Sequence, residues 1–444
     1  MQIHAERAFA FALALTFVLV APVTAVATVE KADVPCPGFT DIPGIGPACP
    51  VEGGYEILLE NGRRLFTHGG DPLPPDLGFE PSTPGEAPIG EWGIFSGVTP
   101  RDPVCVSSPL EAHGVLVYAH AADRLPRYAE MAPILRTWMR YVNGLLARDS
   151  AEFGLDFRYR MLCDGGSLVV HHAVMPRPAS ETSFQTIVTD LQAQGYDNPY
   201  AKYWIWNDDT GIVARCGCGG TGDFINEPRP SPDNPNNRGP SYGVTHAFMS
   251  EWSPFTMMHE NGHNLGAVLS KAAASSGAAH CNDGLDVMCY ADGGPKSNYK
   301  IVCGRYTFDC NRDTYFHPFP PANSVLASHW NLALPTNRYI QGCHYATGRI
   351  PGSLNGIDVD RATAVTVDVP PGCGGRAFAL YGESLPQTSL SPSNFDVCWY
   401  GAPGLMRCDA TASSTERGTV PAGATAARII YRFGAGSAYT LSIQ

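Results

Sequence analysis

The sequence predicts an α+β fold of more than one domain, and three observations lead to that prediction. The chain has 444 residues, of which 44% are hydrophobic and 16% are charged, so it is too long for one small core and too apolar to be disordered. Its central part alternates segments of helix-like and strand-like periodicity. After Pro351 only short alternating segments remain, separated by Gly, Pro and Ser turns. We therefore expect a mixed twisted sheet with helices, followed by a small β-domain.

Residues 1–27 have the features of a secretory signal peptide. Arg7 precedes an uncharged run over residues 8–20, and the small residues Ala25-Val26-Ala27 follow it. The apolar run is short for a bilayer and breaks at Pro22, which argues against a membrane anchor. We expect cleavage after Ala27, a secreted, extracellular protein, and no membrane span in the mature chain.

Cysteine content and charge indicate the compartment and exclude one class of partner. All 14 cysteines lie beyond the expected cleavage point, and an even number in an exported chain indicates disulfide bonds. Cys216 and Cys218 could together hold a metal, but in an oxidising compartment we expect each of them to bond a distant cysteine. The formal net charge is −12 and Lys and Arg are not clustered, so we expect no nucleic-acid partner.

Residues 28–104 form a Pro/Gly-rich N-terminal segment, in which we expect turns and extended chain rather than regular structure. Such a segment serves as a propeptide or as an arm that wraps the next domain. In a propeptide, the thiolate of Cys36 or Cys49 could cap a zinc ion, whereas a structural disulfide is the favoured interpretation.

Residues 105–348 carry the regular pattern of the main domain. The segment 114–120, "GVLVYAH", predicts a strand, and apolar residues recur at helical spacing over 127–147. The same reasoning predicts strands at 155–162, 167–175, 201–208 and 242–250 and a helix at 183–195. Residues 349–444 predict a small C-terminal β-sandwich, for which we expect contact with a surface or a glycan rather than catalysis.

The stretch 256–290, "TMMHENGHNLGAVLSKAAASSGAAHCNDGLDVMCY", predicts the chemistry. Ser253-Pro254 supplies an N-cap residue and a proline at the first helical position, so a helix should start there. On that helix His259 and His263 are four residues apart, so their rings project from one face at the separation two imidazoles need to share an ion. Glu260 follows the first histidine, and its carboxylate suits a general base acting on a metal-bound water.

Catalytic zinc uses three protein ligands and keeps a fourth position for water, so a third ligand must come from elsewhere. The first glutamate after Glu260 is Glu383, deep in the predicted β-domain, which argues against a glutamate. His280 follows a stretch of small residues that can close a loop cheaply, because closure entropy grows only logarithmically with length. Asp283 and Asp286 are rival third ligands, since carboxylates also bind zinc.

The stretch resembles the metzincin metallopeptidases, whose pattern is HExxHxxG followed by a third histidine and a methionine turn below the metal. Four residues match the first part in place: His259, Glu260, His263 and Gly266. Met288 is the candidate for the methionine turn, and Tyr290 resembles the Met-x-Tyr of the astacin and serralysin branches. The stretch also looks like a group of secreted bacterial metalloproteases that have a spaced third histidine and a similar "DVMCY" turn.

One departure from the metzincin pattern concerns the third ligand. In most metzincins it falls three residues after the glycine, and here that position is Leu269. The insertion 269–279, "LSKAAASSGAA", instead separates the glycine from His280.

The resemblance implies a metzincin-like catalytic domain with an active-site helix. It implies Zn²⁺ on His259, His263 and His280, with Glu260 as general base and Tyr290 as a further ligand or an oxyanion donor. It also implies an extended substrate along an edge strand, and "YGVTHAFMS" (242–250) is the candidate strand.

The predicted function is therefore a secreted zinc metalloendopeptidase that acts on proteins or peptides. The alternative is a catalytically silent secreted protein with a structural zinc site, which binds a surface or glycan through its C-terminal β-domain. Glu260 discriminates between the two, because a silent site has no need of that carboxylate. The acidic residues from Asp283 to Asp292 could in addition hold calcium.

Overall fold

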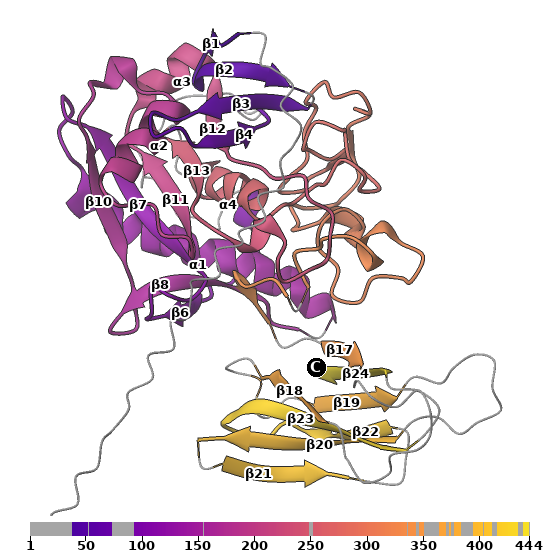
Figure 1. Ribbon diagram of the computed structural model, residues 1–444. Helices are drawn as coiled ribbons and strands as arrows, with labels where there is room; N and C mark the ends of the chain where they lie inside the picture. The colour runs from indigo at the N-terminus through magenta and orange to yellow at the C-terminus, as the bar shows by residue number, and fades with distance from the viewer. Residues whose placement is uncertain are drawn as a thin grey trace, which may run out of the picture. The chain divides into compact units, whose positions relative to one another are not determined.

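The computed structural model has an α+β fold, as predicted, with a mixed main sheet, flanking helices and smaller sheets (Figure 1). It describes residues 38–51, 53–72, 93–153, 155–247, 252–334, 336–342, 346–349, 364–369, 373, 377–382, 394–402, 404–410, 415–433 and 438–443. The expected signal peptide lies outside these residues. Within them, no helix combines the length and the apolar character needed to cross a bilayer.

A ten-stranded sheet forms the centre of the main domain, and its principal strand order is β16-β8-β7-β11-β13-β12-β5. These strands are β5 (Asp71–Pro72), β7 (His113–Ala121), β8 (Arg158–Asp164), β11 (Ala201–Asn207), β12 (Cys218–Gly222), β13 (Ser241–His246) and β16 (Ile340–Gln341). Beside this path lie β6 (Val104–Val106), β9 (Ser167–Leu168) and β10 (Val170–Met175). The strands predicted at 114–120, 155–162, 167–175 and 201–208 are confirmed.

The edge of this sheet differs from the prediction. The segment expected at the edge, 242–250, contributes β13, which pairs with β11 on one side and β12 on the other. Every residue of β13 is buried, which is typical of a strand inside a sheet that is covered on both faces. The last long strand is β12, and the short strand β5 pairs with its outer side.

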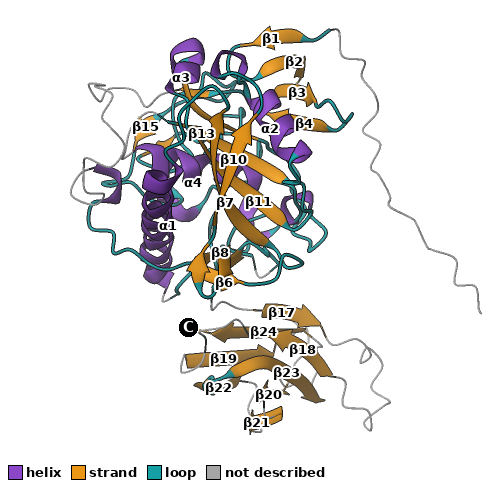
Figure 2. Ribbon diagram, turned by 90° about the vertical axis from the view of Figure 1, so that its left-hand side faces the viewer, coloured by secondary structure: helices purple, strands orange, loops and turns teal. Residues whose placement is uncertain are grey.

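Helices and strands cover the two faces of the sheet (Figure 2). Along β11, Trp204 and Trp206 belong to the core that contains helices α1 (Tyr128–Ser150) and α4 (Trp252–Asn264). Tyr203 and Ile205 alternate with them and belong to the core formed with helix α2 (Phe184–Ala193). The helices predicted at 127–147 and 183–195 are α1 and α2, and Ser183 caps α2 by accepting a hydrogen bond from the Thr186 backbone.

The N-terminal segment is more regular than expected. Four strands form an antiparallel sheet in chain order: β1 (Thr40–Ile42), β2 (Gly46–Val51), β3 (Gly54–Leu58) and β4 (Arg64–Thr67). Gly53 and Gly62 have φ angles of 81° and 82°, so they serve the tight turns of a meander rather than an irregular chain. Ile45 and Ile57 are buried in the same core as α2, so this sheet packs directly on the main domain.

The remaining elements are short or lie toward the C-terminus. They are α3 (Thr210–Cys216), β14 (Asp283–Gly284), β15 (Lys300–Ile301) and the 3-10 turns Gly93–Phe95, Ala151–Phe153, Ala179–Glu181, Pro235–Asn237, Cys310–Arg312 and Val325–Ala327. Two four-stranded antiparallel sheets follow: β17 (Ala346–Arg349), β24 (Ala438–Ile443), β19 (Ala377–Gly382) and β22 (Thr415–Thr419), then β18 (Ala364–Asp368), β23 (Ala424–Phe433), β20 (Asn394–Gly401) and β21 (Gly404–Asp409). Phe378 of one sheet and Trp399 of the other share one apolar core, as expected of a sandwich.

Disulfide bonds are present, as the cysteine content predicts. The described pairs are Cys105–Cys163, Cys216–Cys218, Cys281–Cys289, Cys303–Cys310 and Cys398–Cys408. The expectation of distant partners for Cys216 and Cys218 was wrong, because the two cysteines bond each other. Gly217 between them adopts the left-handed conformation, with a φ of 65° that ends α3 and turns the chain into β12.

Candidate metal centre

Helix α4 carries the first two histidines of the centre. His259 and His263 lie one turn apart and are both buried, and their Nε2 atoms are 3.1 Å apart. The helix packs closely on β12, where a side chain at Gly220 would collide with the carboxyl of Glu260. The glycines of β12 therefore allow α4 to lie directly against the sheet.

The loop after α4 brings the third histidine back to the helix. The helix ends at Asn264, and Gly266 follows with a φ of 81°, a left-handed conformation that glycine adopts without strain. The Ser276 backbone N–H donates to the His280 carbonyl, which closes the loop of small residues on itself. The His280 ring centroid lies 5.3 Å from that of His259 and 5.0 Å from that of His263.

Two of the three imidazoles are held through their Nδ1 atoms. His259 Nδ1 lies 2.6 Å from the Val287 carbonyl oxygen, and His280 Nδ1 lies 3.1 Å from Asp292 Oδ2. With Nδ1 donating to these oxygens, the Nε2 atom carries the free lone pair that binds a metal. This arrangement of backbone and carboxylate partners is the one that orients histidine ligands.

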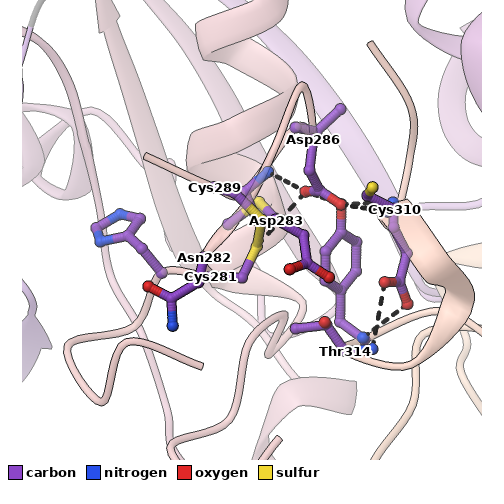
Figure 3. The surroundings of a disulfide bond; sticks show 12 residues. Cys281, Asn282, Asp283, Asp286, Cys289, Cys310 and Thr314 are labelled. Carbon is purple, nitrogen blue, oxygen red and sulfur yellow. Dashed lines mark hydrogen bonds between the residues drawn. A yellow bond between two sulfur atoms is a disulfide. The ribbon is translucent and has the colours of Figure 1, made fainter. Parts of the chain in front are cut away.

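Met288 lies beneath the helix and is fully buried. Its sulfur packs against Gly262, and this close contact is possible because glycine has no side chain: a Cβ at this position would collide with the sulfur. Asp286 holds the turn: its carboxylate accepts hydrogen bonds from the backbone N–H groups of Met288 at 2.6 Å and Cys310 at 2.5 Å and from the Tyr315 hydroxyl at 2.8 Å (Figure 3).

The rival third ligands lie elsewhere. Asp286 is engaged in the turn, and Asp283 accepts a hydrogen bond from Asn311 Nδ2 at 2.8 Å. The structure does not bring either carboxylate to the histidines. Asp292 contacts His280 instead, so among the described residues the acidic stretch 283–292 does not gather three carboxylates into one calcium-type group.

Asp71 of β5 lies among the three histidines, and no sequence motif predicted it there. Its Oδ1 atom is 3.0 Å from His280 Nε2. Its Oδ2 atom is 3.3 Å from His259 Nε2 and 3.9 Å from His263 Nε2. Although burial favours the neutral form, the neighbouring imidazoles hold the pKa of Asp71 well below its usual range. The carboxylate is therefore charged at neutral pH.

Two further side chains contact Asp71. The hydroxyl of Tyr290 donates a hydrogen bond to Oδ1, and His68 Nδ1 lies 3.7 Å from the same atom. His68, Asp71, His263 and His280 each offer a ligand atom, and these atoms all lie within 4.8 Å of one another. Cys49 lies in β2 and is disulfide-bonded, so it offers no thiolate to a metal. The N-terminal segment contributes the Asp71 carboxylate to the centre instead.

Glu260 completes the group from the side of β12. Its side chain is fully buried, and burial followed by the nearby charge of Asp71 raises the pKa of this carboxyl well above its ordinary value. A carboxyl with a raised pKa holds a proton more readily than an ordinary glutamate does.

The donor set fits a zinc ion. Three imidazole nitrogens and one carboxylate oxygen are ligands that zinc prefers, whereas calcium and magnesium prefer oxygen alone. Buried polar atoms without a hydrogen bond gather at the same place: Glu260 Oε1 and Oε2, Asp71 Oδ2 and His280 Nε2. Buried atoms of this kind normally have a partner, and a bound cation would satisfy them.

Comparisons with known proteins add a distant structural likeness. No known family and no curated protein matches the sequence. Wild-type OgpA from Akkermansia muciniphila aligns with a TM-score of 0.25 and 10% identity over 74% of this chain and 86% of that chain. Catalytically inactive OgpA in complex with an O-glycopeptide substrate aligns with a TM-score of 0.25 and 11% identity over 76% and 88%. A likeness at this level assigns neither a family nor a function.

Proposed function

We propose that the chain is a secreted zinc endopeptidase. The observation that carries this proposal is the convergence of three buried imidazoles, those of His259, His263 and His280, beside the buried carboxyl of Glu260. Two of the rings have their Nδ1 atoms anchored, which directs Nε2 toward the common centre. The disulfides agree with an exported protein.

The three histidines would hold the zinc ion through Nε2. When bound, zinc polarises a carbonyl and lowers the pKa of a bound water to about 7. Glu260 would take a proton from that water on its carboxylate and return it to the leaving amine, a role that its raised pKa supports. Burial raises the pKa of Tyr290 well above its usual value, so its phenol stays protonated and can donate to a developing oxyanion.

One observation favours the alternative of a catalytically silent binding protein. Asp71 gives the histidines a fourth protein donor, and zinc sites with four protein ligands are typically structural. In that case the C-terminal sheets would supply the function through contact with a surface or glycan. Against it stands Glu260, a buried carboxyl that a structural site has no need to place there.

Glu260→Ala tests the proposal. We expect this variant to bind zinc like its parent but to lose cleavage of reduced casein by about 10²- to 10⁴-fold, because the general base is gone. Zinc content is measured by atomic absorption, and cleavage is measured with and without a chelator. Because Asp71 contacts the histidines, it could hinder cleavage. The cleavage rate of Glu260→Ala is therefore compared with that of its parent twice, once with Asp71 present and once in the Asp71→Ala background.

Glu60→Ala is the control, since it removes a glutamate whose side chain is 67% exposed. It should cleave like its parent. If neither zinc-loaded parent cleaves casein, or if Glu260→Ala cleaves as fast as its parent, the endopeptidase proposal is wrong.

A further inference from the structure

We propose that His120 and His172 form a second metal site, which binds a divalent transition-metal ion that prefers imidazole. His120 lies near the end of β7 and His172 lies in β10, and the two strands pair in parallel. In this register His172 is opposite Tyr118, two residues before His120, so both imidazoles project from the same face of the sheet. Strands β11 and β13 lie between β7 and β12, so the pair is separate from the centre on α4.

The spacing of the two nitrogens matches that of neighbouring ligands on one ion. His120 Nε2 and His172 Nε2 are 3.0 Å apart. With metal–nitrogen bonds of about 2.0 to 2.1 Å, ligand atoms at right angles on an ion lie roughly 3 Å apart. The two imidazoles can therefore occupy adjacent positions on a single ion.

The His120 ring is prepared to act as a ligand. Its Nδ1 atom lies 2.9 Å from the carbonyl oxygen of Ala121. Because a carbonyl oxygen only accepts, Nδ1 carries the proton and Nε2 carries the free lone pair that faces His172. A backbone carbonyl anchors His259 of the α4 centre in the same way.

The His172 ring is supported by an aromatic side chain and is open to solvent. It stacks on Tyr128, with ring centroids 4.7 Å apart and planes inclined by 7°. The Tyr128 hydroxyl donates to the Val170 carbonyl at 2.7 Å, which fixes the ring that His172 lies on. His120 is buried whereas His172 is exposed, so an ion that arrives from solvent meets one fixed and one accessible imidazole.

Two imidazoles make a site of moderate affinity. Within the part of the chain that the structure describes, no third His, Cys, Asp or Glu forms a metal-binding group with them, so water would fill the other positions. With so few protein ligands, affinity follows the intrinsic order of the metals, in which Ni²⁺ and Cu²⁺ stand high. The competing interpretation is a hydrogen bond alone, in which His172 Nε2 donates to His120 Nε2.

The test adds Ni²⁺ to the full-length chain after the chain has been loaded with zinc. Equilibrium dialysis followed by atomic absorption measures both the nickel bound and the zinc retained. We expect the parent protein to bind one equivalent of nickel without loss of zinc, and His172→Ala to bind it at least tenfold more weakly. Nickel should also raise the melting temperature of the parent but not that of the variant, because an ion that binds only the folded chain stabilises it.

His171→Ala is the matched control. His171 is the neighbour of His172 in β10 but projects from the opposite face, where its ring centroid lies 5.8 Å from that of Tyr196. This variant should bind nickel like the parent. His120→Gln should bind it as weakly as His172→Ala, and because His172 is exposed, His172→Ala gives a result even if His120→Gln does not fold.

The possible outcomes decide between a metal site and a hydrogen bond. Absence of nickel binding by the parent, or equal binding by the parent and His172→Ala, would overturn the site. Nickel uptake matched by an equal loss of zinc would place the ion in the α4 centre and would also contradict the proposal. Cleavage is not measured, so the result is independent of the proposed endopeptidase function.

Discussion

The two halves of the metal centre are built in different ways. The α4 half gains its geometry from local structure, since one helical turn is enough to align His259 with His263. The other half joins His280 from an irregular loop and Asp71 from a distant strand, so tertiary contacts alone fix it. Side chains on a rigid helix need little support, whereas a ligand on a loop depends on the residues that hold the loop.

Carboxylates and a disulfide provide that support. Asp292 contacts His280 Nδ1 and accepts a hydrogen bond from the Ser276 hydroxyl, which joins the two ends of the loop. Asp286 holds the turn that contains Met288, and the Cys281–Cys289 bond closes the same turn. Changes at these carboxylates should damage the loop half and leave the helix half intact.

The largest effect is expected from Asp286→Ala. This change leaves the N–H groups of Met288 and Cys310 and the Tyr315 hydroxyl without their buried acceptor. An unsatisfied buried group costs about 1 to 3 kcal/mol, so we expect the free energy of unfolding to fall by about 3 kcal/mol or more. Urea unfolding of the metal-free protein measures it.

Asp283→Ala is the control for this change, since Asp283 belongs to the same loop but accepts its hydrogen bond from the exposed Asn311 amide. We expect it to shift stability by less than about 1 kcal/mol. Equal losses for the two variants would mean that Asp286 does not hold the turn.

A smaller effect is expected from Asp292→Ala. The variant should fold, but His280 loses the acceptor of its Nδ1 proton, so zinc affinity should fall by about 10- to 100-fold. Competition with a fluorescent chelator measures the affinity. Unchanged affinity would show that the loop backbone orients the His280 ring without this carboxylate.

The smallest effect concerns Lys202, beside the helix half. Its buried ammonium donates to the carbonyl of Asn264, the last residue of α4, at 2.7 Å, and burial lowers its pKa to about 7. Because this pKa is lower in the folded protein, the unfolded chain binds more protons above pH 7. The contribution of Lys202 to stability should therefore rise by about 1 kcal/mol between pH 7 and pH 8.

Lys202→Met removes this contribution. It also removes a charge that lowers the pKa of the buried Asp223 carboxyl, and this second effect changes the difference between the two proteins in the same direction. The difference in unfolding free energy between the parent and Lys202→Met should increase over that pH interval. A constant difference would show that Lys202 titrates in the folded protein as it does in the unfolded chain.

Sequence patterns predicted the local structure of the molecule and missed the contacts between segments that are distant in the sequence. The helices and most strands of the main sheet followed from periodicity. Asp71 and His68 belong to no motif, and only the pairing of β5 with β12 brings them to the histidines. The N-terminal segment forms a sheet although its Pro/Gly content predicts irregular chain, because the turns of a tight meander have the same composition.

The edge strand shows the same limit. The segment 242–250 was recognisable as a strand, but its neighbours are set by the whole sheet, and β12 is so rich in glycine that its sequence does not indicate a strand. The pairing of Cys216 with Cys218 likewise depends on the left-handed turn at Gly217.

The most direct measurement is a crystal structure of the zinc-loaded protein with anomalous diffraction data collected at the zinc edge. We expect a single strong peak within about 2.0 to 2.2 Å of the Nε2 atoms of His259, His263 and His280. A peak bound by His68 in place of any of these three histidines, or the absence of a peak between the three imidazoles, would contradict the assignment of this centre.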